Sequence, residues 1–499
     1  MERILLEAKS ICNADGGTLY LHTEDNRLKF AIMHTDSLPI AMGGTTGKKI
    51  SAPPIPLYDE TTGEPNHNNV ASHAALTGSS VNIPDAYAAE GFDFSGTKEF
   101  DERNNYRSTS FLTIPLKNHL DEVIGVLQLL NAQDRETGEV IPFASELQRV
   151  IESLASLAAT ALDNQMLLQS QKDLLDSFIE VIADAIDAKS PYTAGHCARV
   201  PIITEMIVDS ANEATTGRFK DFNFTEEDRY ELRIASLLHD AGKVTTPVHV
   251  VDKATKLETI YDRISTVKTR FEVLKRDAEI SYLKALTWKD ADLVTLETNF
   301  QARLSQFDDD QVFIESVNFG GEFMDPEKSD RIQQIAKYRW TNAEGVETNF
   351  LTEEEVYNLC IPRGTLTPEE REIINNHVVI TINMLEKLPF PRHLQRVPEY
   401  AGAHHERMDG KGYPRGLTGD QMSIPARAMA IADVFEALTA SDRPYKKQKP
   451  LSEVIRIMGF MTKEGHLDPD LFDLFVESGA YRKYAEEYLQ PDQIDDIDN

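Results

Sequence analysis

An apolar heptad repeat runs through the middle of the chain and limits how the rest can be arranged. It follows Phe143 and uses two positions of each heptad. The first position holds Leu147, Leu154, Ala161, Leu168, Leu175 and Ile182, and the second holds Val150, Leu157, Asn164, Gln171, Phe178 and Ala185. A repeat of this length predicts one long linker helix over 143–189 that forms a coiled coil, with Asn164 and Gln171 fixing its register. We therefore expect a homodimer through this helix; the alternative is a helix packed on its own domain.

The segment before this helix has a different pattern. Residues 1–142 contain short strand-like stretches at 17–21, 28–33, 110–115 and 123–130, separated by Gly, Pro, Asn and Asp. The segment 34–109 is rich in loop residues. Such a pattern predicts an α+β domain built on an antiparallel sheet.

After the linker helix the chain has mainly helical periodicity. Two apolar runs in 257–308, the first starting at Ile260, fit amphipathic helices in a hairpin. Thr367 and Glu370 form a capping-box pattern, which predicts the start of a further helix. The chain ends in an acidic tail over 486–499, and we expect its last segment, PDQIDDIDN, to fray.

Charge and composition restrict the class of partner. The 499 residues carry a formal net charge of -31, which argues against polymeric nucleic acid or an anionic membrane surface. A small anionic substrate would need local positive charge, which bound metal supplies best. Cys12, Cys197 and Cys360 are far apart, so a disulfide framework is not expected. The N-terminus lacks a signal-like apolar stretch and no apolar run is long enough to span a membrane, so we expect a soluble, cytoplasmic protein.

A set of histidines and aspartates recurs beside apolar segments, where unpaired polar groups are costly. The set consists of His196, His239, Asp240, His377, His404, His405 and Asp433. Each residue alone could be an ordinary surface or capping residue, but together they favour a metal site for Fe, Mn or Zn. The set exceeds what one ion needs, and Asp240 could offer one oxygen to each of two ions. Lys243, one helical turn beyond His239, could then contact a phosphate oxygen.

Three segments carry a more specific signal: LLHDAGK, HHERMDGKGYP and IADVFEALTASDRPY. They resemble the signature of HD-GYP phosphodiesterases, a branch of the HD-domain metal phosphohydrolase superfamily. The resemblance covers about 173–250 and 362–480. It implies an all-helical catalytic domain over 173–485 that hydrolyses a cyclic dinucleotide, usually cyclic di-GMP, to the linear dinucleotide and in some cases to mononucleotides.

The same resemblance implies roles for individual residues. One divalent ion, Fe or Mn, would be surrounded by His196, His239, Asp240 and Asp433, and a second by Asp240, His377, His404 and His405. The resemblance also places substrate contacts at Lys243, Tyr413 and Arg443, with Lys446 a weaker candidate. Asp240 and Lys243 would be the catalytic residues.

The chain also departs from the family pattern. His239 and His377 are unusually far apart, which predicts a helical insertion over about 252–361. Thr381 stands where the family commonly has glycine. Tyr192 stands where some members have a glutamate that helps to hold a third ion, and Asp187 is the nearest upstream acid. We therefore expect two ions per chain and not three.

The N-terminal domain resembles a GAF domain, a small-molecule sensor fold. The segments that carry this resemblance are 81–87, 100–116 and 122–134. Phe100, Asp101 and Glu102 partly match a cyclic-nucleotide-binding GAF motif. A small-molecule ligand and a purely dimerising role both remain open for this domain.

The sequence therefore predicts a GAF-regulated cyclic-dinucleotide phosphodiesterase. Two alternatives stay open: a phosphodiesterase for 3',3'-cyclic GMP-AMP, and a catalytically silent receptor for a cyclic dinucleotide. A complete ligand set together with Lys243 argues against the receptor.

Overall fold

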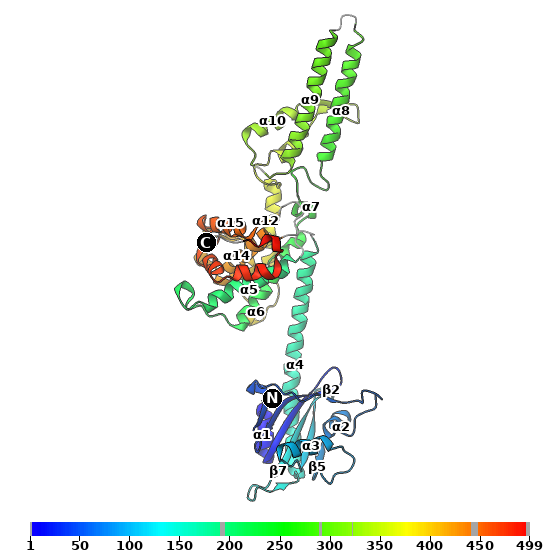
Figure 1. Cartoon of the computed structure of the whole chain (residues 1–499), viewed down its shortest axis with the longest axis vertical. Coiled ribbons are helices and arrows are strands. Elements are labelled where there is room, and N and C mark those ends of the chain that lie inside the picture. Colours follow the sequence, from blue (N-terminus) through cyan, green and yellow to red (C-terminus); the bar gives the residue numbers. More distant parts are fainter. Residues whose placement is uncertain (1, 190–194, 289–291, 322, 441–447, 496–499) are drawn as a thin grey trace. The chain divides into compact units, whose positions relative to one another are not determined.

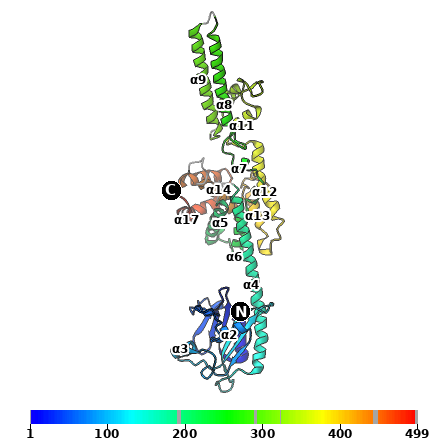
Figure 2. The ribbon, with the colours of Figure 1, turned by 90° about the vertical axis from the view of Figure 1, so that its right-hand side faces the viewer.

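The computed structural model of the chain describes residues 2–189, 195–288, 292–321, 323–440 and 448–495. It contains two compact units, 1–175 and 176–499, which are described separately below. Figures 1 and 2 show their elements in two views.

The first unit is built on an antiparallel sheet with the order β3-β2-β1-β7-β6-β5. Its strands are β1 (Ala14–His22), β2 (Arg27–Thr35), β3 (Ile40–Gly43), β5 (Val81–Ile83), β6 (Phe111–Lys117) and β7 (Val123–Gln133), with short β4 (Ile55–Pro56) and β8 (Val140–Ile141) at its sides. The predicted α+β class is confirmed. Three of the strand-like stretches predicted from the sequence lie within β1, β2 and β7, and the fourth, 110–115, begins one residue before β6; the shorter strands were not predicted.

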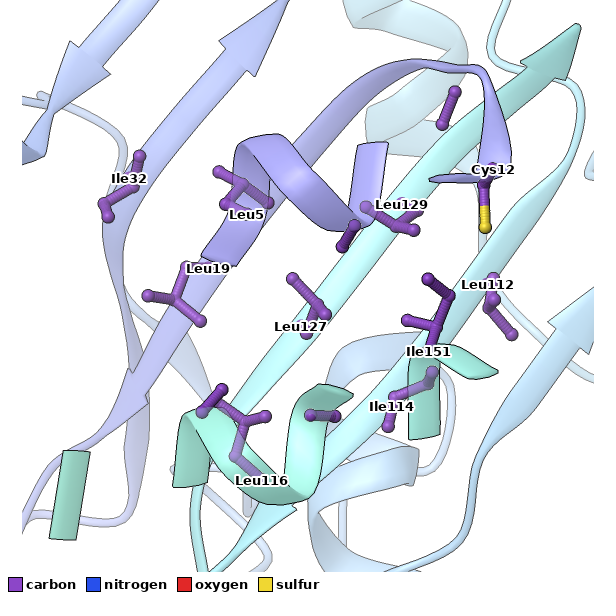
Figure 3. Packing of buried hydrophobic residues seen from close by; sticks show 14 of the residues in the cluster. Leu5, Cys12, Leu19, Ile32, Leu112, Ile114, Leu116, Leu127, Leu129 and Ile151 are labelled. Atoms are coloured by element: carbon purple, nitrogen blue, oxygen red, sulfur yellow. The ribbon is translucent and has the colours of Figure 1, made fainter. Parts of the chain in front are cut away.

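Helices cover both faces of this sheet. Successive residues of a strand point to opposite faces, so each face presents apolar side chains that a helix can bury. On one face, α1 (Glu2–Cys12) and the first half of α4 (Ser145–Asp187) pack onto Leu19, Ile114 and Leu127 through residues such as Leu5 and Ile151 (Figure 3). On the other face, α2 (Val70–Thr77) packs beside buried Tyr20 and Val126. α3 (Ser95–Asn104) precedes β6.

The long helix α4 confirms the predicted helix but changes its interpretation. Ile151, Ala155, Ala158, Ala159 and Leu162 are buried in the core of the sheet domain. The first half of α4 thus packs on its own domain, which was the alternative to a coiled coil. Predicted heptad positions farther round the helix are free of that core: Leu157 is 69% exposed, Leu168 67% and Phe178 59%. The homodimer therefore stays a prediction.

The second unit is a helical bundle, as predicted. Its helices are α5 (His196–Glu213), α6 (Glu226–Leu238), α7 (Val248–Val251), α12 (Pro368–Leu385), α13 (Val397–Gly402), α14 (Ile424–Thr439), α15 (Leu451–Lys463), α16 (Pro469–Glu477) and α17 (Ala480–Tyr488). The capping box of Thr367 and Glu370 starts α12 as predicted. α14 is buried along most of its length and packs against α5.

The predicted insertion forms a subdomain with its own core. α8 (Ile264–Ala285) and α9 (Leu293–Asn318) make the expected hairpin (Figure 2), followed by α10 (Pro326–Ala336) and α11 (Glu353–Leu359). Phe271, Phe307 and Phe350 lie in this core. The prediction of helices alone was wrong here, because β9 (Arg339–Thr341) and β10 (Glu347–Asn349) form a short antiparallel hairpin. Ile260 was also assigned wrongly: it precedes α8 and is 91% exposed.

The structure describes the acidic tail as far as residue 495, and this part packs against the helical unit. The prediction that the tail frays was therefore wrong for 491–495. Gln493 is buried and its Nε2 donates to Thr439 O at 2.9 Å, while Asp495 accepts hydrogen bonds from Ser452. Residues 496–499 lie outside the described residues. Within the parts of the chain that the structure describes, no helix is both long enough and apolar enough to cross a membrane.

Candidate metal centre

The helical unit brings all the predicted metal ligands together. His196 is the first residue of α5, His239 and Asp240 follow α6, His377 lies in α12, His404 and His405 follow α13, and Asp433 lies in α14. Three overlapping groups have ligand atoms within 4.8 Å of one another: His196, His239 and Asp433; His239, Asp240 and His404; and His377, His404 and His405.

Asp240 lies between two sets of imidazoles. Its Oδ2 is 3.3 Å from Nε2 of His196 and 3.3 Å from Nε2 of His239. Its Oδ1 is 3.1 Å from Nε2 of His377 and 4.0 Å from Nε2 of His404. The two oxygens of one carboxylate therefore face two different groups of nitrogen atoms.

The orientation of the imidazoles is set by their other nitrogen. Nδ1 of His239, His377 and His404 lies 2.7, 2.5 and 2.5 Å from the carbonyl oxygen three residues earlier in the chain. A carbonyl only accepts, so Nδ1 carries the proton and the Nε2 lone pair faces the centre. Histidine ligands of metals are held in this way in proteins.

Several inward-facing atoms lack a hydrogen bond. Asp240 Oδ1, His377 Nε2 and His404 Nε2 are buried and make no hydrogen bond with any of the described residues, although Oδ1 and the His377 nitrogen approach each other. A buried acceptor without a partner is costly. A cation among these atoms would satisfy all of them, so the donor set fits a bound metal.

The electrostatics of the centre favour a cation. Burial alone would raise the pKa of Asp240 and Asp433, but the Lys243 ammonium beside Asp240 and the hydrogen bond from His196 to Asp433 hold both pKa values well below the ordinary range. Burial lowers the pKa of His405 to about 4. Both carboxylates are thus ionised and His405 is neutral at physiological pH, which are the states that ligate metal.

Lys243 lies on η3 (Ala241–Thr245), directly beside the centre. Its Nζ is 2.5 Å from Asp240 Oδ2. The preceding Gly242 permits this placement, because a Cβ there would lie 1.9 Å from the His377 carbonyl oxygen. The amide of Gly242 donates to Thr381 Oγ1 at 2.8 Å. Thr381, a departure from the family pattern, therefore ties α12 to the loop that carries Lys243.

The HHERMDGKGYP segment begins with His404 and His405 and forms a loop next to the centre. Glu406 is buried and accepts backbone hydrogen bonds from Arg415 at 2.7 Å and Leu417 at 2.9 Å. The Tyr413 ring lies 4.9 Å from the His405 ring, so this tyrosine is next to the predicted ligands. The two other predicted substrate contacts, Arg443 and Lys446, lie outside the described residues.

Sequence reasoning missed Glu436. This buried glutamate places Oε2 2.5 Å from His196 Nδ1 and accepts from Arg199 Nε through Oε1 at 2.7 Å. It therefore fixes the orientation of His196. The available signal was its position three residues after Asp433, which puts both carboxylates on one face of α14.

In the sheet domain, the side chain of Asp101 makes hydrogen bonds within the domain that stabilise the local fold. It is buried and accepts hydrogen bonds from the Tyr87 hydroxyl and from the backbone and hydroxyl of Ser108, all at 2.8 Å. Its carboxylate thus holds the chain between α3 and β6.

Comparisons with known proteins agree with these two units. A GAF-domain model matches residues 1–162, and HD-domain models match 193–307 and 353–471. The 3'3'-cGAMP-specific phosphodiesterase 3 of Vibrio cholerae is 25% identical over 391 residues, which cover 74% of this chain and 57% of that protein. The cyclic di-GMP phosphodiesterase of Thermotoga maritima is 32% identical over 228 residues, covering 42% and 60%. The 3'3'-cGAMP-specific phosphodiesterase 1 of V. cholerae is 51% identical over 82 residues, covering 16% and 19%.

The chain therefore has an N-terminal segment that matches a GAF domain and two later segments that match HD domains, and the three relatives are named as phosphodiesterases of cyclic di-GMP or 3'3'-cGAMP. It spans less than two thirds of the length of each of these three curated relatives. The GAF match extends beyond the predicted boundary at 142 because the first half of α4 completes the core of that domain.

Proposed function

We propose that this chain is a metal-dependent phosphodiesterase that opens cyclic di-GMP by hydrolysis. The observation that carries the proposal is the position of Asp240, whose two oxygens face two groups of histidines in a buried centre. A second substrate, 3',3'-cyclic GMP-AMP, is supported by the names of two of the Vibrio cholerae relatives.

Two divalent ions, Fe or Mn, would share Asp240. His196, His239 and Asp433 would complete the sphere of one ion, and His377, His404 and His405 that of the other. When bound, such a pair of ions would neutralise phosphate charge and lower the pKa of water, which is the chemistry that hydrolysis of a phosphodiester needs. Hydrolysis breaks one P–O bond of the ring and adds the hydroxyl of water to phosphorus and its proton to the departing sugar oxygen.

The remaining residues would bind and orient the phosphodiester. Lys243 Nζ lies beside Asp240, so a phosphate held at the centre would lie within reach of its positive charge. Such a contact strengthens as negative charge develops in the transition state. Tyr413 would contact the substrate from the HHERMDGKGYP loop, where its ring lies beside that of His405. Arg443 and Lys446 are proposed as further contacts on the family resemblance alone.

The proposal is tested with purified chain, Mn²⁺ or anaerobic Fe²⁺, and each cyclic dinucleotide in turn, with products separated by chromatography. We expect linear dinucleotide to form from cyclic di-GMP only in the presence of metal, and Asp240→Asn to abolish it. Wild-type protein that retains metal but hydrolyses neither cyclic dinucleotide would contradict the proposed activity and favour the receptor.

We further propose that α4 pairs with α4 of a second copy and that the GAF domain regulates hydrolysis through this helix. The support is the exposed apolar side chains of Leu157, Leu168 and Phe178 at heptad positions. The double variant Leu157→Glu, Leu168→Glu should be monomeric by light scattering. Ser170→Glu, another exposed position on α4, is the matched control and should leave the mass unchanged.

A further inference from the structure

The end of α4 is anchored against the elements that carry the metal centre. The Tyr230 hydroxyl of α6 donates to Asp176 Oδ1 at 2.6 Å, and Arg233 lies 3.5 Å from Glu180. Ile179, Ala183 and Ile186 are buried on the same side of the helix. α6 ends at Leu238 and is followed directly by His239 and Asp240.

Asp187, the last residue of α4, holds the start of α5. Its buried carboxylate accepts a hydrogen bond from the Cys197 amide at 3.1 Å. The N-cap residue of α5 is Gly195, which offers no side chain for this purpose. A helix N-terminus has amide groups without intrahelical partners. Asp187 therefore supplies the missing cap from another helix, immediately next to His196.

Lys189, two residues farther on, holds the segment that carries Lys243. Its Nζ donates to the carbonyl oxygen of Lys243 at 2.7 Å and to that of Val244 at 2.5 Å. These carbonyls belong to η3, the segment that presents the Lys243 ammonium to Asp240. The backbone position of Lys243 is thus set by a side chain from the turn that directly follows α4.

We propose that Asp187 and Lys189 are positioning residues through which α4 controls the metal-proximal groups His196 and Lys243. This inference rests on the proposed function and names its means of regulation. α4 is one uninterrupted helix, and its first half is part of the GAF core. A rotation or shift of such a helix moves both anchors together, and displacements near 1 Å at a catalytic site cost on the order of 10²-fold in rate.

The first test uses single variants of the full chain. Lys189→Met should lower kcat about 10- to 100-fold with little change in KM, because Lys243 is misplaced. Lys189→Arg, which keeps a donor, should retain most of the activity. Asp187→Asn should weaken metal affinity about 10-fold through His196. Lys172→Met and Asp184→Asn, the same changes at exposed positions of α4, are the controls.

The second test measures coupling. One alanine inserted after Gln169 should change kcat in the wild-type chain, because it alters the register of α4. The same insertion should have no further effect in the Asp187→Asn, Lys189→Met double variant. Equal effects in both backgrounds, or no effect in the wild type, would overturn the proposal. If the wild type hydrolyses no cyclic dinucleotide, the proposed function fails. The inference is then still tested by metal affinity, which should be weaker in Asp187→Asn than in Asp184→Asn; equal affinities would overturn it.

Discussion

Glu436→Gln tests whether the orientation of one histidine controls metal binding. The carboxylate of Glu436 is buried and receives charge-assisted hydrogen bonds from His196 and Arg199. The amide keeps the shape of the side chain but offers only one oxygen, so its NH₂ group must face one of the two donors. Loss of such a supporting carboxylate costs about 10- to 100-fold in metal affinity, or about 1.4–2.8 kcal/mol.

The assay is a competition of metal-free protein with a chelator for Mn²⁺, followed by kcat at saturating metal. Glu231→Gln is a matched control: Glu231 is also buried, and it accepts hydrogen bonds from the backbone and Nε of Arg396 at 2.5 and 2.7 Å away from the centre. We expect Glu231→Gln to lower stability without changing metal affinity. Equal affinity in wild type, Glu436→Gln and Glu231→Gln would refute the assigned role.

Three further predictions concern the same unit. Lys243→Ala should lower kcat about 10²–10³-fold with full metal content, and loss of metal would show that the assigned role is wrong. Lys253→Met removes the buried partner of Glu370 and should lower the free energy of unfolding, measured in urea, by about 3 kcal/mol. Adding Glu370→Gln should restore part of this loss. A loss below about 1 kcal/mol would contradict the prediction. Burial lowers the pKa of His405 to about 4 in the folded metal-free chain, from about 6.5 in the unfolded chain. Between pH 6.5 and 4 the unfolded chain therefore binds a proton at His405, and the folded chain does not. The melting temperature of metal-free protein should therefore fall as pH falls through this window, and less steeply in His405→Asn; equal slopes would remove this explanation.

The sequence was most informative where chemistry leaves a distinctive residue pattern. Histidines and aspartates beside apolar segments are improbable without a partner, so His239 and Asp433 could be assigned to one site although they are far apart in the chain. The start of α12 was also predictable, because Thr367 and Glu370 form a local capping pattern.

Features that depend on distant contacts were not predictable. Glu436 appears in the sequence as one more helical glutamate, and only the packing of α14 against α5 shows its contact with His196. The heptad pattern of α4 did not reveal that Ile151 would be buried against the sheet, since a coiled coil and a packed helix share much of the same periodicity. The three-residue strands β9 and β10 are too short to give an alternating signal.

The most direct test of a centre bridged by Asp240 is its metal stoichiometry combined with magnetic coupling. Metal-free chain is loaded with Mn²⁺, freed of excess ion, and measured by elemental analysis and electron paramagnetic resonance. We predict two ions per chain with an exchange-coupled spectrum, as expected for ions about 3.5–4 Å apart. Asp240→Asn should lose the coupling. A single ion per chain, two magnetically isolated ions, or a reproducible value near three would contradict the account.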